Sequence, residues 1–130
     1  MRRGELGAMT KAELKQELLK RTRRFAARIF KLVDRLPRTT GSIVVINQLL
    51  RASASVASNY RSVNRAKSKR DFCNKLRIVL EESDECDFWL TFLVDIGVMK
   101  ADDPELNFLV KEANEFIAIF TAAAKTASGQ

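Results

Sequence analysis

Apolar side chains recur every three or four residues along four long segments, and this spacing restricts the fold more than any other feature. A period near 3.6 residues is typical of one face of an α-helix, whereas a half-buried strand alternates every second residue. The four lines are Leu18, Phe25, Ile29, Leu32 and Leu36; Ile46, Leu49, Ser53, Val56, Tyr60 and Val63; Phe72, Leu76, Val79, Ser83, Cys86, Leu90 and Leu93; and Leu106, Leu109, Ala113, Phe116, Phe120 and Ala123. The sequence therefore predicts an all-α chain.

Capping and terminating residues set the expected helix ends. Thr10 with Glu13 forms a capping-box pattern, and Pro37 ends the first helix at the residue before it. Ser42 is the expected N-cap of the second helix, and Asp103 before Pro104 opens the fourth. The expected helices are 10–36, 42–66, 68–96 and 104–126, in one domain over 10–127 with a flexible segment at 1–9 and a frayed tail at 128–130. Short connections favour an antiparallel up-down-up-down four-helix bundle.

Two features that support much enzymatic chemistry are missing from the sequence. The 130 residues contain no histidine, which removes the usual acid-base group and the commonest metal ligand. No Gly-rich phosphate loop is present, and no apolar run reaches the length of a membrane helix. Cys73 and Cys86 lie on one expected helix, too far apart for a disulfide. We expect a cytoplasmic protein with no enzymatic activity, cofactor, metal, small-molecule substrate or membrane partner.

One acidic cluster remains as a candidate site. Glu82 and Glu85 are three residues apart on the third helix and could share a cation, but two carboxylates make a weak metal site. In a hairpin of the second and third helices, Arg51 lies opposite position 83. The favoured interpretation is pairing of Arg51 with Glu82 or its neighbours. A solvated acidic face is the second alternative.

Charge is divided unevenly along the chain. Residues 1–70 hold 18 Lys and Arg against 4 Asp and Glu, whereas residues 71–130 hold 5 against 12. This division is typical of a nucleic-acid surface, and equally of two faces that attract each other within a fold or an oligomer. Charge alone leaves both interpretations open.

Two groups of cations are the candidate nucleic-acid-binding residues. Cations on the first helix form a stripe beside its apolar line, for which a solvated flank is the alternative; those of the second group surround the corner between the second and third helices. The groups are Arg21, Arg24, Arg28, Lys31 and Arg35, and Arg61, Arg65, Lys67, Lys69 and Arg70. Lys69 and Arg70 lie in a first helical turn, where the macrodipole disfavours cations and an anionic partner would compensate. Because Tyr60, the only tyrosine, lies on the core line, we expect RNA or DNA to be bound through its backbone and not by base stacking.

Two further patterns concern packing. Small residues gather at Ala52, Ser53, Ala54, Ser55, Ala57 and Ser58, which predicts close approach of a neighbouring helix more than a binding pocket. A second apolar line on the third helix consists of Trp89, Phe92 and Ile96, and Phe88 lies near it. A helix that is apolar over two faces has two partners, so this line is the candidate oligomer interface. A wider intramolecular core is the alternative.

Four segments carry a resemblance to a known family: RTRRFAARIFKLVDRLP (21–37), NQLLRASASVASNYRSVNRAKSKRDFCNKLRIVLEESDE (47–85), WLTFLVDIG (89–97) and KEANEFIAIFTAAAKTA (111–127). The sequence resembles the bacterial four helix bundle protein family, whose relatives are encoded by intervening sequences in large-subunit ribosomal RNA genes. A more distant relative is the accessory variability protein of diversity-generating retroelements. The resemblance implies a homo-oligomeric ring, pentameric in this family, without established enzymatic activity. The retroelement relatives bind nucleic acid and a reverse transcriptase through a basic surface.

Two functions therefore stay open at the level of sequence. One is a non-enzymatic homo-oligomeric bundle that binds nucleic acid through the basic surface of its first two helices. The other is a protein-only scaffold or partner-binding module.

Overall fold

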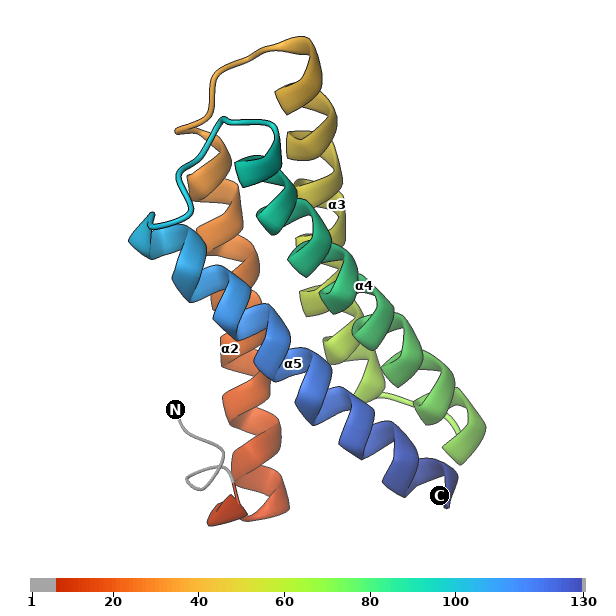
Figure 1. Ribbon diagram of the computed structural model, residues 1–130. Helices are drawn as coiled ribbons and strands as arrows, with labels where there is room; N and C mark the ends of the chain where they lie inside the picture. Colours follow the sequence, from red (N-terminus) through yellow and green to blue (C-terminus); the bar gives the residue numbers. More distant parts are fainter. Residues whose placement is uncertain (1–6, 130) are drawn as a thin grey trace.

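The computed structural model describes residues 7–129, which contain four α-helices and no strand. The helices are α2 (Lys11–Val33), α3 (Thr40–Val63), α4 (Lys69–Asp95) and α5 (Pro104–Ser128). Consecutive helices run in opposite directions, and the start of α2 lies at the same end of the bundle as the end of α5 (Figure 1). The predicted all-α, four-helix fold is confirmed.

The core lies where the four predicted apolar lines meet. All of their residues are buried except Phe72 and Ala123, which are half-buried. Phe25 of α2 packs edge-to-face on Phe116 of α5, with ring centroids 5.3 Å apart. α3 and α4 run side by side, whereas α5 crosses α2 at an angle (Figure 1). The α2–α5 seam therefore opens toward its ends, and side chains that bridge it must be long.

The end of α2 differs from the expected one. The helix stops at Val33, three residues before the predicted end. The backbone N–H groups of Asp34, Arg35 and Leu36 donate to carbonyls three residues back, at 3.0–3.3 Å. The reason is Pro37, because a proline disfavours the α conformation at the residue before it, and the last turn tightens.

The start of α3 also differs, since Thr39 and not Ser42 is its N-cap. The Thr39 hydroxyl accepts the N–H of Ser42, and the Ser42 hydroxyl accepts the N–H of Thr39 at 2.9 Å. Ser42 thus completes a reciprocal cap from the third helical position, where Glu or Gln is the usual residue. α3 ends at Val63, where the expected range continued to 66, and Asn64 donates from its side chain to the carbonyl of Tyr60 at 2.9 Å.

The remaining ends stay close to the expected ones. Ser68 caps α4 and Asp103 caps α5. Gly97 follows α4 with φ 76°, a left-handed conformation that glycine adopts without strain. α5 extends two residues beyond its predicted end to Ser128. The expected flexible segment at 1–9 lies largely, and Gln130 of the expected frayed tail wholly, outside the described residues.

Candidate functional site

The cations of the α2 stripe fall into two groups, those with and those without an acidic partner. Three of the arginines bind acidic residues of α5 or of its cap. Arg21 donates to both carboxylate oxygens of Glu112, at 3.0 and 2.5 Å. Seven and fourteen residues further on, Arg28 binds Glu105 with two hydrogen bonds and Arg35 binds Asp103 at 2.5 Å. These three ion pairs form a ladder along the α2–α5 seam.

Arg21 is 2% exposed, so it is wrong as a surface candidate for nucleic-acid binding. Glu115 lies 3.5 Å from its guanidinium, and the Phe116 ring centroid lies 5.4 Å away. Burial lowers the pKa of Arg21, but the hydrogen bond and charge of Glu112 outweigh burial and raise the pKa above its ordinary value. Its Nη1 atom is buried without a hydrogen-bond partner among the described residues. Glu112 therefore compensates the buried charge of Arg21.

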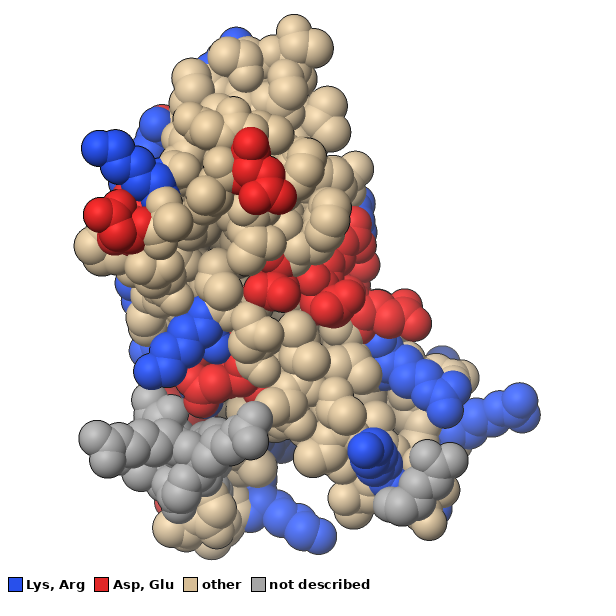
Figure 2. Space-filling model, in the orientation of Figure 1, with Lys and Arg blue, Asp and Glu red and all other residues tan. Residues whose placement is uncertain are grey.

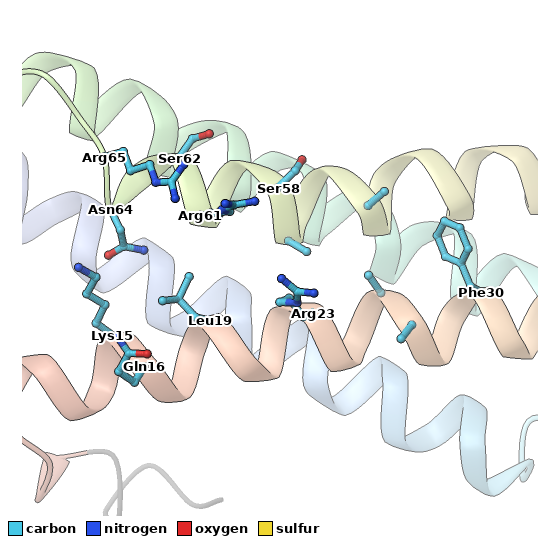
Figure 3. Close-up of a pocket in the computed structure, with 14 residues that line it drawn as sticks. Lys15, Gln16, Leu19, Arg23, Phe30, Ser58, Arg61, Ser62, Asn64 and Arg65 are labelled. Carbon is cyan, nitrogen blue, oxygen red and sulfur yellow. The ribbon is translucent and has the colours of Figure 1, made fainter.

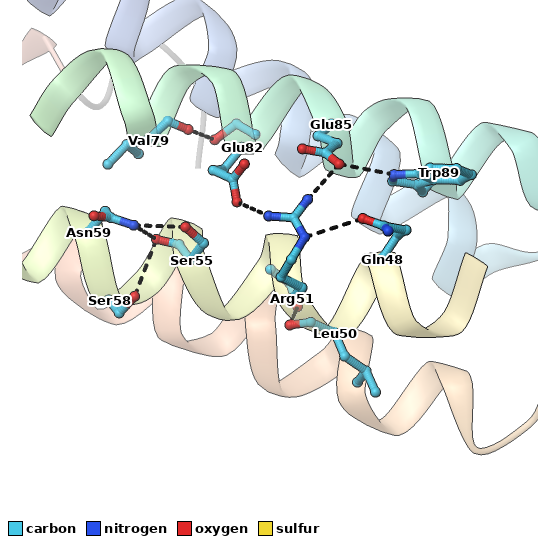
Figure 4. Close-up of polar contacts among 12 residues, drawn as sticks. Gln48, Leu50, Arg51, Ser55, Ser58, Asn59, Val79, Glu82, Glu85 and Trp89 are labelled. Carbon is cyan, nitrogen blue, oxygen red and sulfur yellow. Dashed lines mark hydrogen bonds and ion pairs between the residues drawn. The ribbon is translucent and has the colours of Figure 1, made fainter. Parts of the chain in front are cut away.

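Arg51 ties α3 to α4, as the sequence predicts. Its guanidinium donates to Glu82 at 2.8 Å and to Glu85 at 2.5 Å, and Glu85 also accepts the indole N–H of Trp89 at 3.3 Å (Figure 4). The hydrogen bond from Arg51 is the main reason that the pKa of Glu85 lies below its ordinary value. Within residues 7–129 no group of three or more potential metal ligands is assembled.

A groove of ≈ 1020 Å³ runs along the outer side of α2 and α3. Ala54, Ala57 and Ser58 of α3 and Ala26 and Ala27 of α2 contribute small side chains to its lining. The small residues of α3 therefore fall into a buried group and an exposed group. Ala52 and Ser53 are buried against neighbouring helices as predicted, whereas Ala54 and Ser58 are exposed and leave the groove open. The prediction that small residues serve packing more than a pocket holds for only part of the run.

Four cations line the groove and no acidic residue does. Lys15 and Arg23 come from α2, and Arg61 and Arg65 from α3 (Figure 3). All four are exposed, and none forms an ion pair within the described part of the chain. Lys15 and Arg23 are absent from the sequence-based candidates, although they share one face of α2 with Leu19 and Ala27 at four-residue spacing.

The corner between α3 and α4 carries the second group of cations. Lys67, Lys69 and Arg70 are exposed and lack ion-pair partners in the range 7–129. Asp71 beside them accepts instead from the backbone N–H of Lys67 and from Lys75 Nζ, at 3.0 and 2.9 Å. Figure 2 shows Lys and Arg side chains at the lower right over this corner, below a band of Asp and Glu on α4. Arg24 and Lys31 of α2 are exposed too and have no ion pair in the described residues.

The second apolar line of α4 forms a compact aromatic cluster. The ring centroid of Phe88 lies 4.8 Å from that of Trp89 and 5.6 Å from that of Phe92. Trp89 and Phe92 pack in part against the core, whereas Phe88 is 54% exposed and Ile96 36%. Trp89 and Phe92 thus contribute to the packing of the bundle, whereas Phe88 and Ile96 remain in contact with solvent.

Comparison with known proteins places this geometry in a family. The model of a family described as 23S rRNA-intervening sequence protein matches residues 15–122. A crystal structure of a protein of unknown function from the S23 ribosomal protein family of Bacteroides thetaiotaomicron is similar, with a TM-score of 0.76 and 26% sequence identity. That similarity covers 85% of this chain and 97% of the other. No curated protein sequence matches the chain. Within residues 7–129, no helix has both the length and the hydropathy needed to cross a bilayer.

Proposed function

The chain belongs to the 23S rRNA-intervening sequence protein family, and from this premise we propose that it is a non-enzymatic, homo-oligomeric, cytoplasmic bundle that binds nucleic acid through the basic surface of α2 and α3. The observation that carries this proposal is the distribution of ion pairs. Arg21, Arg28, Arg35 and Arg51 have carboxylate partners, whereas the cations of the groove and of the α3–α4 corner have none within residues 7–129. Unpaired, exposed cations gathered on one part of a surface favour an anionic ligand.

Phosphate is the anion that this surface fits. The corner holds Lys67, Lys69 and Arg70 close together in sequence, at the N-terminal end of α4. The N–H groups at a helix N-terminus attract anions, so the same corner that disfavours cations in isolation favours a bound phosphate. Contacts to phosphate do not read base sequence, and therefore the proposed binding has weak sequence preference.

Assembly is the second part of the proposal. Phe88 and Ile96 expose apolar surface beside the aromatic cluster, which supports burial against another copy of the chain. A ring of copies would repeat the basic surface and multiply phosphate contacts, each of which adds salt-sensitive affinity. The pentamer that the family resemblance implies is the expected form. Light scattering at micromolar concentration measures the mass, and a stable monomer would contradict this part.

The nucleic-acid part is tested by salt-dependent binding. The wild-type protein should bind labelled RNA or DNA at ~50 mM salt, and the affinity should fall steeply by ~200 mM because condensed counterions are released. The test variant changes Lys67, Lys69 and Arg70 to Gln. A matched control changes Arg38, Lys100 and Lys111, which lie outside the groove and the corner, and alters the net charge equally. The test variant should lower the salt slope on a duplex by ~0.9 for each phosphate that is no longer neutralised, and the control should lower it less. No binding at low salt by an assembled wild-type protein would refute the proposal.

A protein-only scaffold is the second candidate, favoured by one observation. Glu81 and Asp84 of α4 are exposed and have no ion pair in the described residues, so they could meet the basic corner of another copy. If they do, changing Lys67, Lys69 and Arg70 would loosen the assembly instead of weakening nucleic-acid binding. Light scattering on the same variants separates the two functions.

A further inference from the structure

Phe30 is a large aromatic side chain left in solvent at one end of the α2–α3 groove. It is 46% exposed and stands up from α2 beside the groove, whereas the groove cations lie toward the other end (Figure 3). An exposed ring next to a phosphate-binding surface offers a face on which a nucleic-acid base can stack.

Resting on the proposed function, we propose that this groove binds a single strand of nucleic acid, with one base stacked on Phe30 and the phosphates along Lys15, Arg23, Arg61 and Arg65. The charge of the lining supports this occupant, since four of the fourteen lining residues are basic and none is acidic. A polyanion is attracted to the basic part of such a groove, and an acid-free lining gives it no repulsive contact.

The small residues explain how a base reaches the ring. Ala27 of α2 and Ala54 of α3 lie between Phe30 and the cations, and neither side chain extends beyond its Cβ. The channel between the two helices is therefore apolar near Phe30 and basic further along. A flat base fits the first part and the charged backbone fits the second, which is the combination found in proteins that bind single strands.

A double helix does not fit this arrangement in the same way. The bases of a duplex are stacked on each other, so a base reaches an external ring only after it is unpaired and swung out, which is unfavourable by a few kcal/mol. A groove between adjacent packed helices, whose axes are about 8–10 Å apart, is also narrower than a duplex. The geometry therefore favours single strands in the groove, and we expect duplexes to bind the exposed corner cations instead.

This inference reverses the expectation that base stacking plays no part. That expectation rests on Tyr60, which lies beside the basic run in sequence and is buried. Phe30 is 31 positions before Arg61 and reaches the same groove because α2 and α3 are antiparallel neighbours. The stacking platform comes from one helix and half of the cations from the other.

The test compares four ligands by fluorescence anisotropy with the full-length assembled protein. They are a labelled homopyrimidine DNA strand, the same strand with abasic sugars, the corresponding duplex, and the RNA strand of the same sequence. Phe30→Leu removes the ring but keeps an apolar side chain, and Phe108→Leu is the matched control, since Phe108 is an exposed phenylalanine of α5 outside the groove. Circular dichroism confirms that both variants are folded.

The expected result separates stacking from charge. Phe30→Leu should weaken single-strand binding about tenfold with an unchanged salt slope, and should remove the preference for bases over abasic sugars. The pair Arg23→Gln and Arg61→Gln should instead lower the slope on a single strand by ~0.7 for each phosphate that is no longer neutralised. Phe108→Leu should change neither the affinity nor the slope.

Three outcomes would overturn the inference while leaving the proposed function standing. They are equal binding by the Phe30 and Phe108 variants, equal binding of normal and abasic strands, and tighter binding of the duplex than of the single strand. A fourth is dissociation of the oligomer by the Arg23 and Arg61 changes, which would make the groove an interface between copies. Failure of every ligand to bind at ~50 mM salt would instead defeat the proposed function itself.

Discussion

Removing the carboxylate of Glu112 should destabilise the fold more than removing any other acidic group of the α2–α5 ladder. Glu112→Leu takes away both hydrogen bonds of Arg21, which is 2% exposed and already has one unpartnered nitrogen among the described residues. A hydrogen bond to a charged group contributes roughly 1.5–3 kcal/mol, and breaking a buried ion pair costs roughly 3–5 kcal/mol. Because Glu115 lies 3.5 Å from the same guanidinium and offsets part of the loss, we expect ~3 kcal/mol.

Glu105→Leu is the control for this expected loss of stability. Arg28 and Glu105 are 34% and 28% exposed in their side chains, and solvent screens their attraction, so the loss should be ~1 kcal/mol or less. The double change Arg21→Met with Glu112→Leu removes both buried charges and should restore most of the stability. Urea unfolding at one fixed protein concentration measures all three, since an oligomer's stability depends on concentration. A Glu112→Leu variant no less stable than Glu105→Leu would refute the reasoning.

Three shorter predictions concern other residues. Phe25→Ala should lower the free energy of unfolding by ~3–5 kcal/mol because Phe25 is 1% exposed, whereas Phe88→Ala should leave folding nearly unchanged and reduce the mass seen by light scattering. Arg51 and Arg35 hold the pKa values of Glu85 and Asp103 below their ordinary values. The stability that these two ion pairs provide is therefore fully present above about pH 5 and is lost as the pH falls through the lowered pKa values. Acid titration of the urea midpoint should show this loss, and Arg51→Gln should make the loss smaller. A thiol reagent should label half-buried Cys73 in the native protein and not Cys86, since burial raises the pKa of the Cys86 thiol; equal labelling rates would contradict this.

The apolar lines were sufficient to predict the helices because each line continues for about five turns and determines which face is buried. The ends depend on single residues whose alternatives lie close in energy. Thr39 and Ser42 can both cap a helix, and only the carbonyls and hydroxyls around them decide which one does. The last turn of α2 tightened because of Pro37, an effect that a periodic pattern does not contain.

The burial of Arg21 had a signal in the sequence. The line of α2 jumps seven residues from Leu18 to Phe25, and one helical turn lies inside that gap. Position 21 or 22 must face the core there, and both Arg21 and Thr22 are buried. Phe30, by contrast, could not be assigned from the spacing, because helical period gives an angle around one axis and not the distance to the neighbouring helix. Its exposure depends on the small side chains of α3 opposite.

The arginine ladder also disfavours other ways of packing α2 against α5. Leu- and Phe-rich faces of two helices can slide past each other by one turn, about 5.4 Å, and still bury most of their apolar area. In this chain such a slip would move Arg21, Arg28 and Arg35 away from Glu112, Glu105 and Asp103 together. The ion pairs thus select one axial register between the first and last described helices, and they do so whether or not they raise the stability of the native state.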